Sequence, residues 1–285
     1  MISLLLAGVL LTADAPYLRT RVEPGDSGSH CLWWKEGTLT YRQDAAGHPD
    51  NPGDSAFTSV EAAFQSWQAV QDRCGSLTLE EGPRITGRTI GYDPAHPENV
   101  VLYRAQRCRD VVAPGDPCLE QDTCGNAHDC WDHPGDTVAL TTTTFVPSTG
   151  QILDADIELN AADFVLTTAD SPACESGALG QGCVAYDVQA TATHEVGHLL
   201  GLDHTGFQGS IMNPTAFVGD LSKRTIDPGS QAFVCDVYPR GEASRDCVGP
   251  SAVPGGGCAA GGGASGFALV LLGLLLGAPG RSRRC

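Results

Sequence analysis

The chain has 285 residues, 41% of them hydrophobic, which is enough to build one sizeable folded domain. Its 17 basic residues stand against 34 acidic ones, and this balance argues against nucleic acid or an anionic membrane surface as a partner. Twelve cysteines are typical of an oxidising compartment, so we expect a protein that is secreted or held at the cell surface or outer envelope.

The first residues resemble a targeting signal. A short apolar run from Ile2 to Leu11 is followed by the small residues of Ala13-Asp14-Ala15. This pattern predicts a secretory signal peptide over residues 1–15, with a buried first strand as the alternative. Residues 16–30 are then expected to form a short irregular extension.

Hydrophobic patterning predicts a mixture of strands and helices over residues 31–240. Apolar residues recur at helical spacing through residues 56–73, and a second helix is expected from its N-cap Asp187 to about Leu200. Short apolar or alternating runs predict strands at residues 39–42, 76–79, 99–103, 137–146 and 152–159.

Ten cysteines lie in the body of the chain, an even number that could all pair. Residues 106–136 hold four of them together with three prolines and many acidic residues, so we expect an insertion loop held by disulfides. The sequence does not fix the connectivity, although Cys174–Cys183 and Cys235–Cys247 would each close a short loop.

One helix carries a candidate metal site. His194 and His198 are four residues apart, so both imidazoles face the same side and could bind one metal ion, with Glu195 close enough to polarise a water. Gly201 can adopt positive φ, end the helix and turn the chain so that His204 supplies a third ligand. Three protein ligands leave a fourth position open, as in a catalytic zinc site. An ordinary amphipathic helix is the alternative for H-E-x-x-H alone.

A methionine follows in a turn-prone setting, Ser210-Ile211-Met212-Asn213-Pro214. Methionine usually fills a gap in a core. A methionine under the three imidazoles would do the same as a hydrophobic floor, without being a ligand.

The pattern H-E-x-x-H-x-x-G-x-x-H with a methionine turn resembles the metzincin signature. With His204-Thr205-Gly206 it is most similar to the matrixin branch, the matrix metalloproteinases and their bacterial relatives. The resemblance implies an α+β catalytic domain: a twisted mixed sheet of about five strands, an active-site helix and two further helices, the last from Asp227 to Tyr238. It also implies that Asp154–Asn160 is the edge strand bordering the substrate cleft.

The resemblance further implies an extracellular, monomeric zinc endopeptidase with one catalytic Zn²⁺ and a protein or peptide substrate. Glu195 would be the general base. Ala161, Ala162 and the strand before them would bind the substrate as an added strand, and residues from Pro214 to Val218 would line the pocket for the side chain beyond the cut. The alternatives are an inactive scaffold used for surface binding or adhesion, and a zinc hydrolase of a non-peptide envelope amide.

Other polar groups suggest additional ions less specifically. Asp154, Asp156 and Glu158 alternate along one strand, so they share a face that could hold Ca²⁺, although an exposed strand face is the favoured reading. A second zinc or calcium site is possible in the insertion, where a solvated loop is favoured; its residues would be His128, Asp129, Asp132 and His133.

Some remaining residues are expected to have structural or surface roles. Arg73-Cys74-Gly75 resembles the core of the matrix metalloproteinase propeptide, but it follows the first helix of the domain, so we prefer a disulfide at Cys74. Three histidines without partners at informative spacing are expected on the surface: His30, His48 and His96.

The C-terminal part looks like a linker over residues 241–264 and a transmembrane or sorting segment over residues 265–285. Ala259 to Gly280 carries no charge and could span a bilayer, and the arginines from Arg281 to Arg284 would orient the C-terminus to the cytoplasm. The glycine-rich stretch with Cys258 and the tail together resemble the MYXO-CTERM sorting tails of myxobacterial surface proteins, with a plain membrane anchor as the alternative.

Overall fold

The computed structural model describes residues 17–35, 37–51, 53–87, 89–121, 123–248 and 268–276. The predicted signal peptide and most of the predicted linker lie outside these residues.

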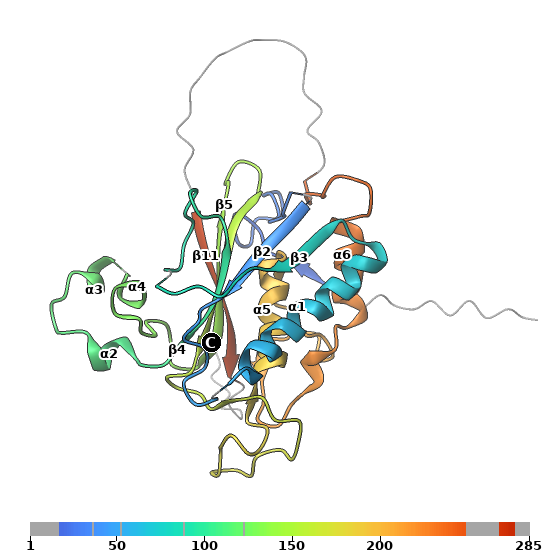
Figure 1. Ribbon diagram of the computed structural model, residues 1–285. Coiled ribbons are helices and arrows are strands. Elements are labelled where there is room, and N and C mark those ends of the chain that lie inside the picture. The colour runs from blue at the N-terminus through green and yellow to red at the C-terminus, as the bar shows by residue number, and fades with distance from the viewer. Residues whose placement is uncertain are drawn as a thin grey trace, which may run out of the picture.

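A mixed sheet runs through the middle of the protein (Figure 1). Three pairings between its strands are parallel, and the last is antiparallel. The five strands lie in the order β3 (Leu77–Glu81), β2 (Gly37–Gln43), β4 (Asn99–Arg104), β6 (Ile152–Asn160) and β5 (Thr137–Phe145). This arrangement confirms the predicted α+β fold with a sheet of about five strands.

Two more strands extend the sheet beyond β5. Strand β11 (Ala268–Leu276) pairs antiparallel with β5, and the short β10 (Thr215–Ala216) pairs parallel with β11. The residues of β11 fall within the segment predicted to cross a membrane, and here they are a strand rather than part of a helix. Within the part of the chain that the structure describes, no helix is both long and apolar enough to cross a bilayer. The role of the tail in anchoring or sorting stays a prediction.

Three helices, α1 (Ser55–Cys74), α5 (Val188–Leu199) and α6 (Pro228–Val237), lie on one side of the sheet (Figure 1). The apolar stripe of α1 is buried against α5 and the sheet, as its three- and four-residue spacing predicts. Its Trp67 is fully buried and donates a hydrogen bond of 2.9 Å from Nε1 to the carbonyl oxygen of Thr193. This bond fixes α1 against the helix that carries the histidines.

The N-terminal extension is more ordered than expected. Strand β1 (Leu18–Arg19) pairs with β9 (Leu202–Asp203), directly after the turn that ends α5. Thr20 strengthens this contact, because its backbone N–H bonds Gly201 O at 2.9 Å and its hydroxyl bonds Leu202 O at 3.0 Å. The extension therefore holds in place the loop that leads to His204. A second short pair lies at the other end of α5, where β7 (Leu166–Thr167) meets β8 (Tyr186–Asp187).

Five disulfides join the ten body cysteines. The predicted Cys174–Cys183 pair is confirmed, and so is a disulfide at Cys74. The predicted Cys235–Cys247 pair is wrong. Cys235 on α6 pairs with Cys74 at the end of α1, and Cys247 pairs with Cys31, because the fold brings together residues 161 and 216 positions apart.

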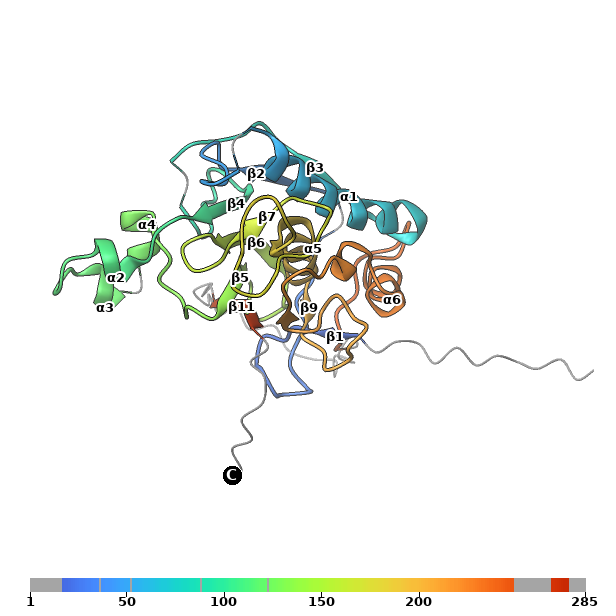
Figure 2. The same ribbon diagram turned by 90° about the horizontal axis from the view of Figure 1, so that it is seen from below.

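The insertion at residues 106–136 is held by the Cys108–Cys130 and Cys118–Cys124 disulfides, as expected for a disulfide-rich loop. It also contains three single-turn helices. They project from the sheet on the side away from α1, α5 and α6 (Figure 2). Their bounds are α2 (Cys108–Val111), α3 (Cys118–Gln121) and α4 (Cys124–His128).

The acidic face of β6 is buried, and its predicted exposure is wrong. Asp154, Asp156 and Glu158 are only 2%, 1% and 3% exposed. Two backbone N–H groups donate to Asp156, and Arg104 Nε donates to Glu158 at 2.6 Å. Because amides and a guanidinium already serve Asp156 and Glu158, the structure does not support the calcium site.

The three histidines expected on the surface have different environments. His48 is buried, with its ring 4.9 Å from that of Tyr103, so its predicted exposure is wrong. The turn after β2 folds it against the sheet, which its sequence spacing does not reveal. His30 and His96 are paired with Asp246 and Asp93, respectively.

Candidate metal centre

Helix α5 positions the first two histidines inside the protein. Its N-cap is Asp187, as predicted, and this carboxylate accepts a 2.7 Å hydrogen bond from Ala190 N. The helix is buried on almost every side, because its small Ala, Thr and Gly residues allow the sheet and α1 to approach closely. His194, Glu195 and His198 are therefore held by a rigid, enclosed element.

The turn after α5 delivers the third histidine. Gly201 has φ of +100°, the conformation expected for the residue that ends the helix. A Cβ here would also lie 2.8 Å from the carbonyl oxygen of Leu32. The chain then runs through β9 and brings His204 back to the helix.

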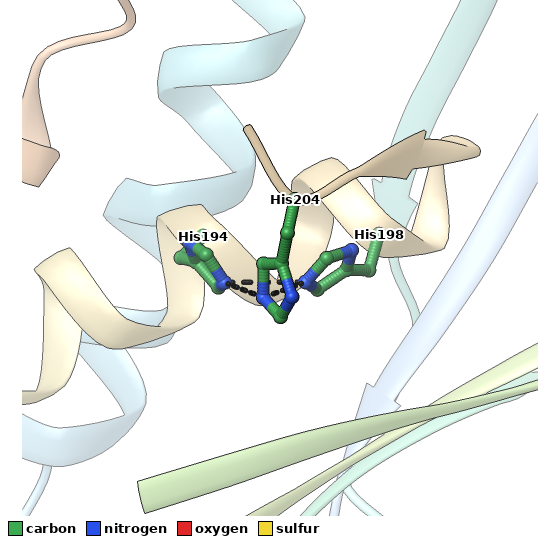
Figure 3. A group of neighbouring side chains, drawn as sticks. All are labelled: His194, His198 and His204. Carbon is green, nitrogen blue, oxygen red and sulfur yellow. Dashed lines mark hydrogen bonds between the residues drawn. The ribbon is translucent and has the colours of Figure 1, made fainter. Parts of the chain in front are cut away.

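The side chains of His194, His198 and His204 point toward one another (Figure 3). Each pair of their Nε2 atoms is 3.1 Å apart. His194 and His198 are fully buried, whereas His204 is partly exposed. The triad therefore has one side open toward solvent.

The chemistry of this donor set fits a cation. The Nδ1 atoms of His194 and His198 face the carbonyl oxygens of Ile211 and Leu202, which can only accept, so each Nδ1 carries the proton. The neutral rings of His194 and His198 then present Nε2 lone pairs to each other with no proton between them. Two tetrahedral zinc ligands at about 2.0–2.1 Å from the metal are themselves separated by about 3.3 Å, close to the spacing found. The triad could hold a metal ion.

Burial also favours the metal-binding form of these rings. It lowers the pKa of His194 and His198 well below the ordinary value, and it lowers the pKa of His204 to about 4. The positive charge of Lys223 acts in the same direction. The three imidazoles are thus neutral at physiological pH, as metal ligation requires.

Glu195 lies beside the triad as a buried carboxyl group. Its Oε2 accepts a 2.7 Å hydrogen bond from the Thr141 hydroxyl on β5. Its Oε1 is buried and has no hydrogen-bond partner among the residues that the structure describes. Burial raises the pKa of Glu195 to about 8, and a cation at the triad would oppose that shift.

Met212 packs against the helix between the two helical histidines. It is 1% exposed, and a Cβ at Gly197 would lie only 2.4 Å from its sulfur atom. The methionine turn is tied to the His204 loop by Thr205 N donating to Met212 O at 3.0 Å. Asp227, the N-cap of α6, accepts a 3.0 Å bond from Ile211 N and completes the attachment.

The substrate-edge prediction needs correction. Strand β6 lies inside the sheet between β4 and β5, so neither it nor the adjoining Ala161 and Ala162 offers a free edge. The strand on the side of the metal centre is β5, whose outer edge is paired with β11 in this structure. Strands β5 and β6 are consecutive in the chain and pair antiparallel. The residue patterns of the two strands do not show which of them lies farther out in the sheet.

The second metal site, which the sequence offered as the less favoured alternative to a solvated loop, does not assemble. His128 faces Asp116, Asp129 pairs with Arg104, and His133 contacts Glu158 and Asp132. Within the described residues, two other groups bring three potential ligands together, but both include cysteines that are bonded in disulfides. The histidine triad is the group with three available ligands.

Lys223 and Thr141 were not singled out from the sequence. Lys223 lies in the 3₁₀ helix η1 (Ser222–Arg224), is 8% exposed, and has its Nζ 3.5 Å from His194 Nδ1. Burial lowers the pKa of Lys223 to about 8. The available signal for Lys223 was its rarity, since the chain has one other lysine, Lys35. Thr141 is one of four consecutive threonines and has no distinguishing signal.

A mixed sheet flanked by a helix with two histidines, and a turn that supplies a third, is the arrangement that the metzincin resemblance implies. Comparison with known families agrees, because residues 123–232 match the family described as Matrixin. The match covers about two-fifths of the chain and includes β5, β6, α5 and the methionine turn. These findings support a matrixin-like metalloprotease.

One curated relative is similar over a shorter stretch. Metalloendoproteinase 2-MMP of Arabidopsis thaliana is 49% identical over 43 residues, which are 15% of this chain and 11% of the plant protein. The chain thus matches only about a tenth of the length of that relative.

Proposed function

We propose that this protein is an extracellular zinc-dependent endopeptidase. The observation that carries the proposal is the convergence of three neutral imidazole Nε2 atoms at 3.1 Å beside a buried carboxyl group. His194, His198 and His204 would hold the zinc ion. The similarity of this chain to matrixins supports the same function.

Zinc held there would polarise the scissile carbonyl group and lower the pKa of a water toward about 7. Glu195 would accept the proton of the attacking water and then deliver it to the leaving amine. Its Oε1 is the atom for this task, because Oε2 is engaged by the Thr141 hydroxyl. Thr141 is thus a positioning residue that fixes the orientation of the base.

The substrate would bind as an extended strand along β5. Strand β11 pairs with β5 along one of its edges and with β10 along the other. This pairing supports the placement, because an extended backbone fits between β5 and β10. Strand β10 lies in the Pro214–Val218 segment expected to line the pocket beyond the cut. Five disulfides support action outside the cytosol, either secreted or anchored at the surface.

The test combines metal content with proteolysis. The protein is purified without added metal, its zinc is measured, and a mixed peptide library is digested with and without chelator. We expect about one zinc per chain and cleavage that chelation abolishes and zinc restores. The variant Glu195→Gln should keep its zinc and its circular dichroism spectrum yet cleave nothing.

Other outcomes would contradict the proposal. Undiminished proteolysis by Glu195→Gln would remove the assigned role of the base. A zinc-free protein that leaves every peptide intact would instead favour the inactive surface-binding scaffold.

A further inference from the structure

A small cavity lies beside the metal centre. It is bordered by Ala190 and Thr191 of α5, by Ala216 and Phe217 after the methionine turn, and by Lys223. Ala190 and Thr191 are four and three residues before His194, so they lie on its face of the helix. The cavity is therefore next to the position where a peptide bond would be cut, on the side of the segment after the methionine turn.

Lys223 brings an unusual charge to this cavity. The side chain is 92% buried, as its 8% exposure shows. Its ammonium group has three N–H donors, one of which bonds the carbonyl oxygen of Asn213 at 2.5 Å. The nearby His194 Nδ1 cannot accept a hydrogen bond from Nζ, since it donates its own proton to Ile211 O. Within the described residues no further acceptor is recorded for Nζ, so the ammonium has donors to spare for a ligand.

The two carboxyl groups that border the cavity, Asp187 and Asp220, hydrogen-bond other groups and not this ammonium. Asp187 is held by two hydrogen bonds from Arg224, at 2.8 and 2.5 Å, so its charge is neutralised. Asp220 is partly exposed and accepts a 2.8 Å bond from Ser222 N instead of from the lysine. A buried cation with unfilled donors beside an apolar rim favours a carboxylate.

The size of the cavity limits the length of the side chain that can enter. Its volume of about 20 Å³ is space for one or two water-sized groups, which a carboxyl group fills. A short acidic side chain suits this space better than a long aliphatic or aromatic one. Apolar Phe217, which is 54% exposed at the rim, would contact the methylene carbon.

We propose that Lys223 makes the enzyme select aspartate as the residue directly after the scissile bond. This inference rests on the proposed endopeptidase function and names its substrate class. Lys223 would donate a charge-assisted hydrogen bond to the aspartate carboxylate. Asparagine has the same shape without the charge, so the Asp-to-Asn preference isolates the contribution of Lys223.

The test uses peptides that differ only at this residue, with Asp, Asn, Glu, Ala or Leu. For the full chain we expect kcat/KM for the Asp peptide to exceed that for the Asn peptide by about tenfold or more. Lys223→Met should reduce this ratio to below about threefold, whereas Asp220→Asn should raise it. Lys35→Met is the matched control, because Lys35 is the other lysine of the chain and is exposed.

A binding measurement separates this inference from the proposed function. The dissociation constants of the Asp and Asn peptides are measured with Glu195→Gln, with and without Lys223→Met. Tighter binding of the Asp peptide that is lost in the double variant supports the role of Lys223 even if the chain cleaves no peptide. Cleavage of all peptides with an Asp-to-Asn ratio near one overturns the role of Lys223 and leaves the endopeptidase function intact.

Discussion

The hydroxyl of Thr141 on β5 donates a 2.7 Å hydrogen bond to Oε2 of Glu195 on α5. This bond joins the strand beside the metal centre to the helix that carries the histidines. Both side chains are completely buried, so water does not compete for the bond. The orientation of the proposed base therefore depends on the sheet as well as on its own helix.

Replacing Thr141 with valine should lower kcat. The shapes of the two side chains are alike, but valine leaves Glu195 Oε2 without its donor, and a lost hydrogen bond to a charged carboxylate of about 1.5–3 kcal/mol corresponds to about a ten- to hundredfold change. Steady-state kinetics with zinc analysis would measure this, and Thr141→Ser should recover most of the rate. A valine variant with the original kcat would show that this bond does not position the base.

Replacing Gly201 with alanine should destabilise the protein and weaken its hold on zinc. The residue has φ of +100°, and the new Cβ would lie 2.8 Å from Leu32 O, so the turn that carries His204 must shift. We expect a loss of about 1–3 kcal/mol in the free energy of unfolding, measured with denaturant, and a raised zinc dissociation constant. Gly177→Ala is the matched control, since Gly177 also has positive φ but its Cβ would meet nothing within 4 Å. Equal zinc affinity in both variants would contradict the role of the turn.

Glu158 should make the fold sensitive to acid. Burial alone would raise its pKa, but the hydrogen bond from His133 and the charge of Arg104 outweigh burial and lower it. A carboxyl group with a lowered pKa stabilises the fold above its unfolded pKa of about 4.3, and that stability is lost as the pH falls through the folded pKa. Urea unfolding at pH 7 and near pH 3 should show a smaller loss in Glu158→Gln than in the unaltered chain. Equal losses would show that this carboxyl group is not linked to stability.

The sequence predicted the local part of the site better than the part made by distant segments. His194, His198, Gly201 and His204 lie within one helix and one turn, so helical geometry places them without knowledge of the sheet. The Cys74–Cys235 pair and the contact between Lys223 and His194 join segments separated along the chain, so spacing did not reveal them. Asp154, Asp156 and Glu158 were correctly placed on one strand face. Their burial depended on the loop and insertion that cover them.

Ending the chain after residue 248 should increase proteolysis. Strand β11 occupies the edge of β5 that we assign to the substrate, so a peptide must displace it before binding. We expect a higher kcat/KM for the shortened chain, mainly through a lower KM, with an unchanged zinc content. Equal kinetic constants for the two chains would show that β11 does not compete with peptides.

The nine residues of β11 can pair with β5 or lie in a membrane, but they cannot do both at once. A segment inserted in a lipid bilayer cannot simultaneously donate backbone hydrogen bonds to β5. With the predicted anchor, insertion of the tail would free this edge of β5, so the proposed peptidase activity would rise once the protein had reached its membrane.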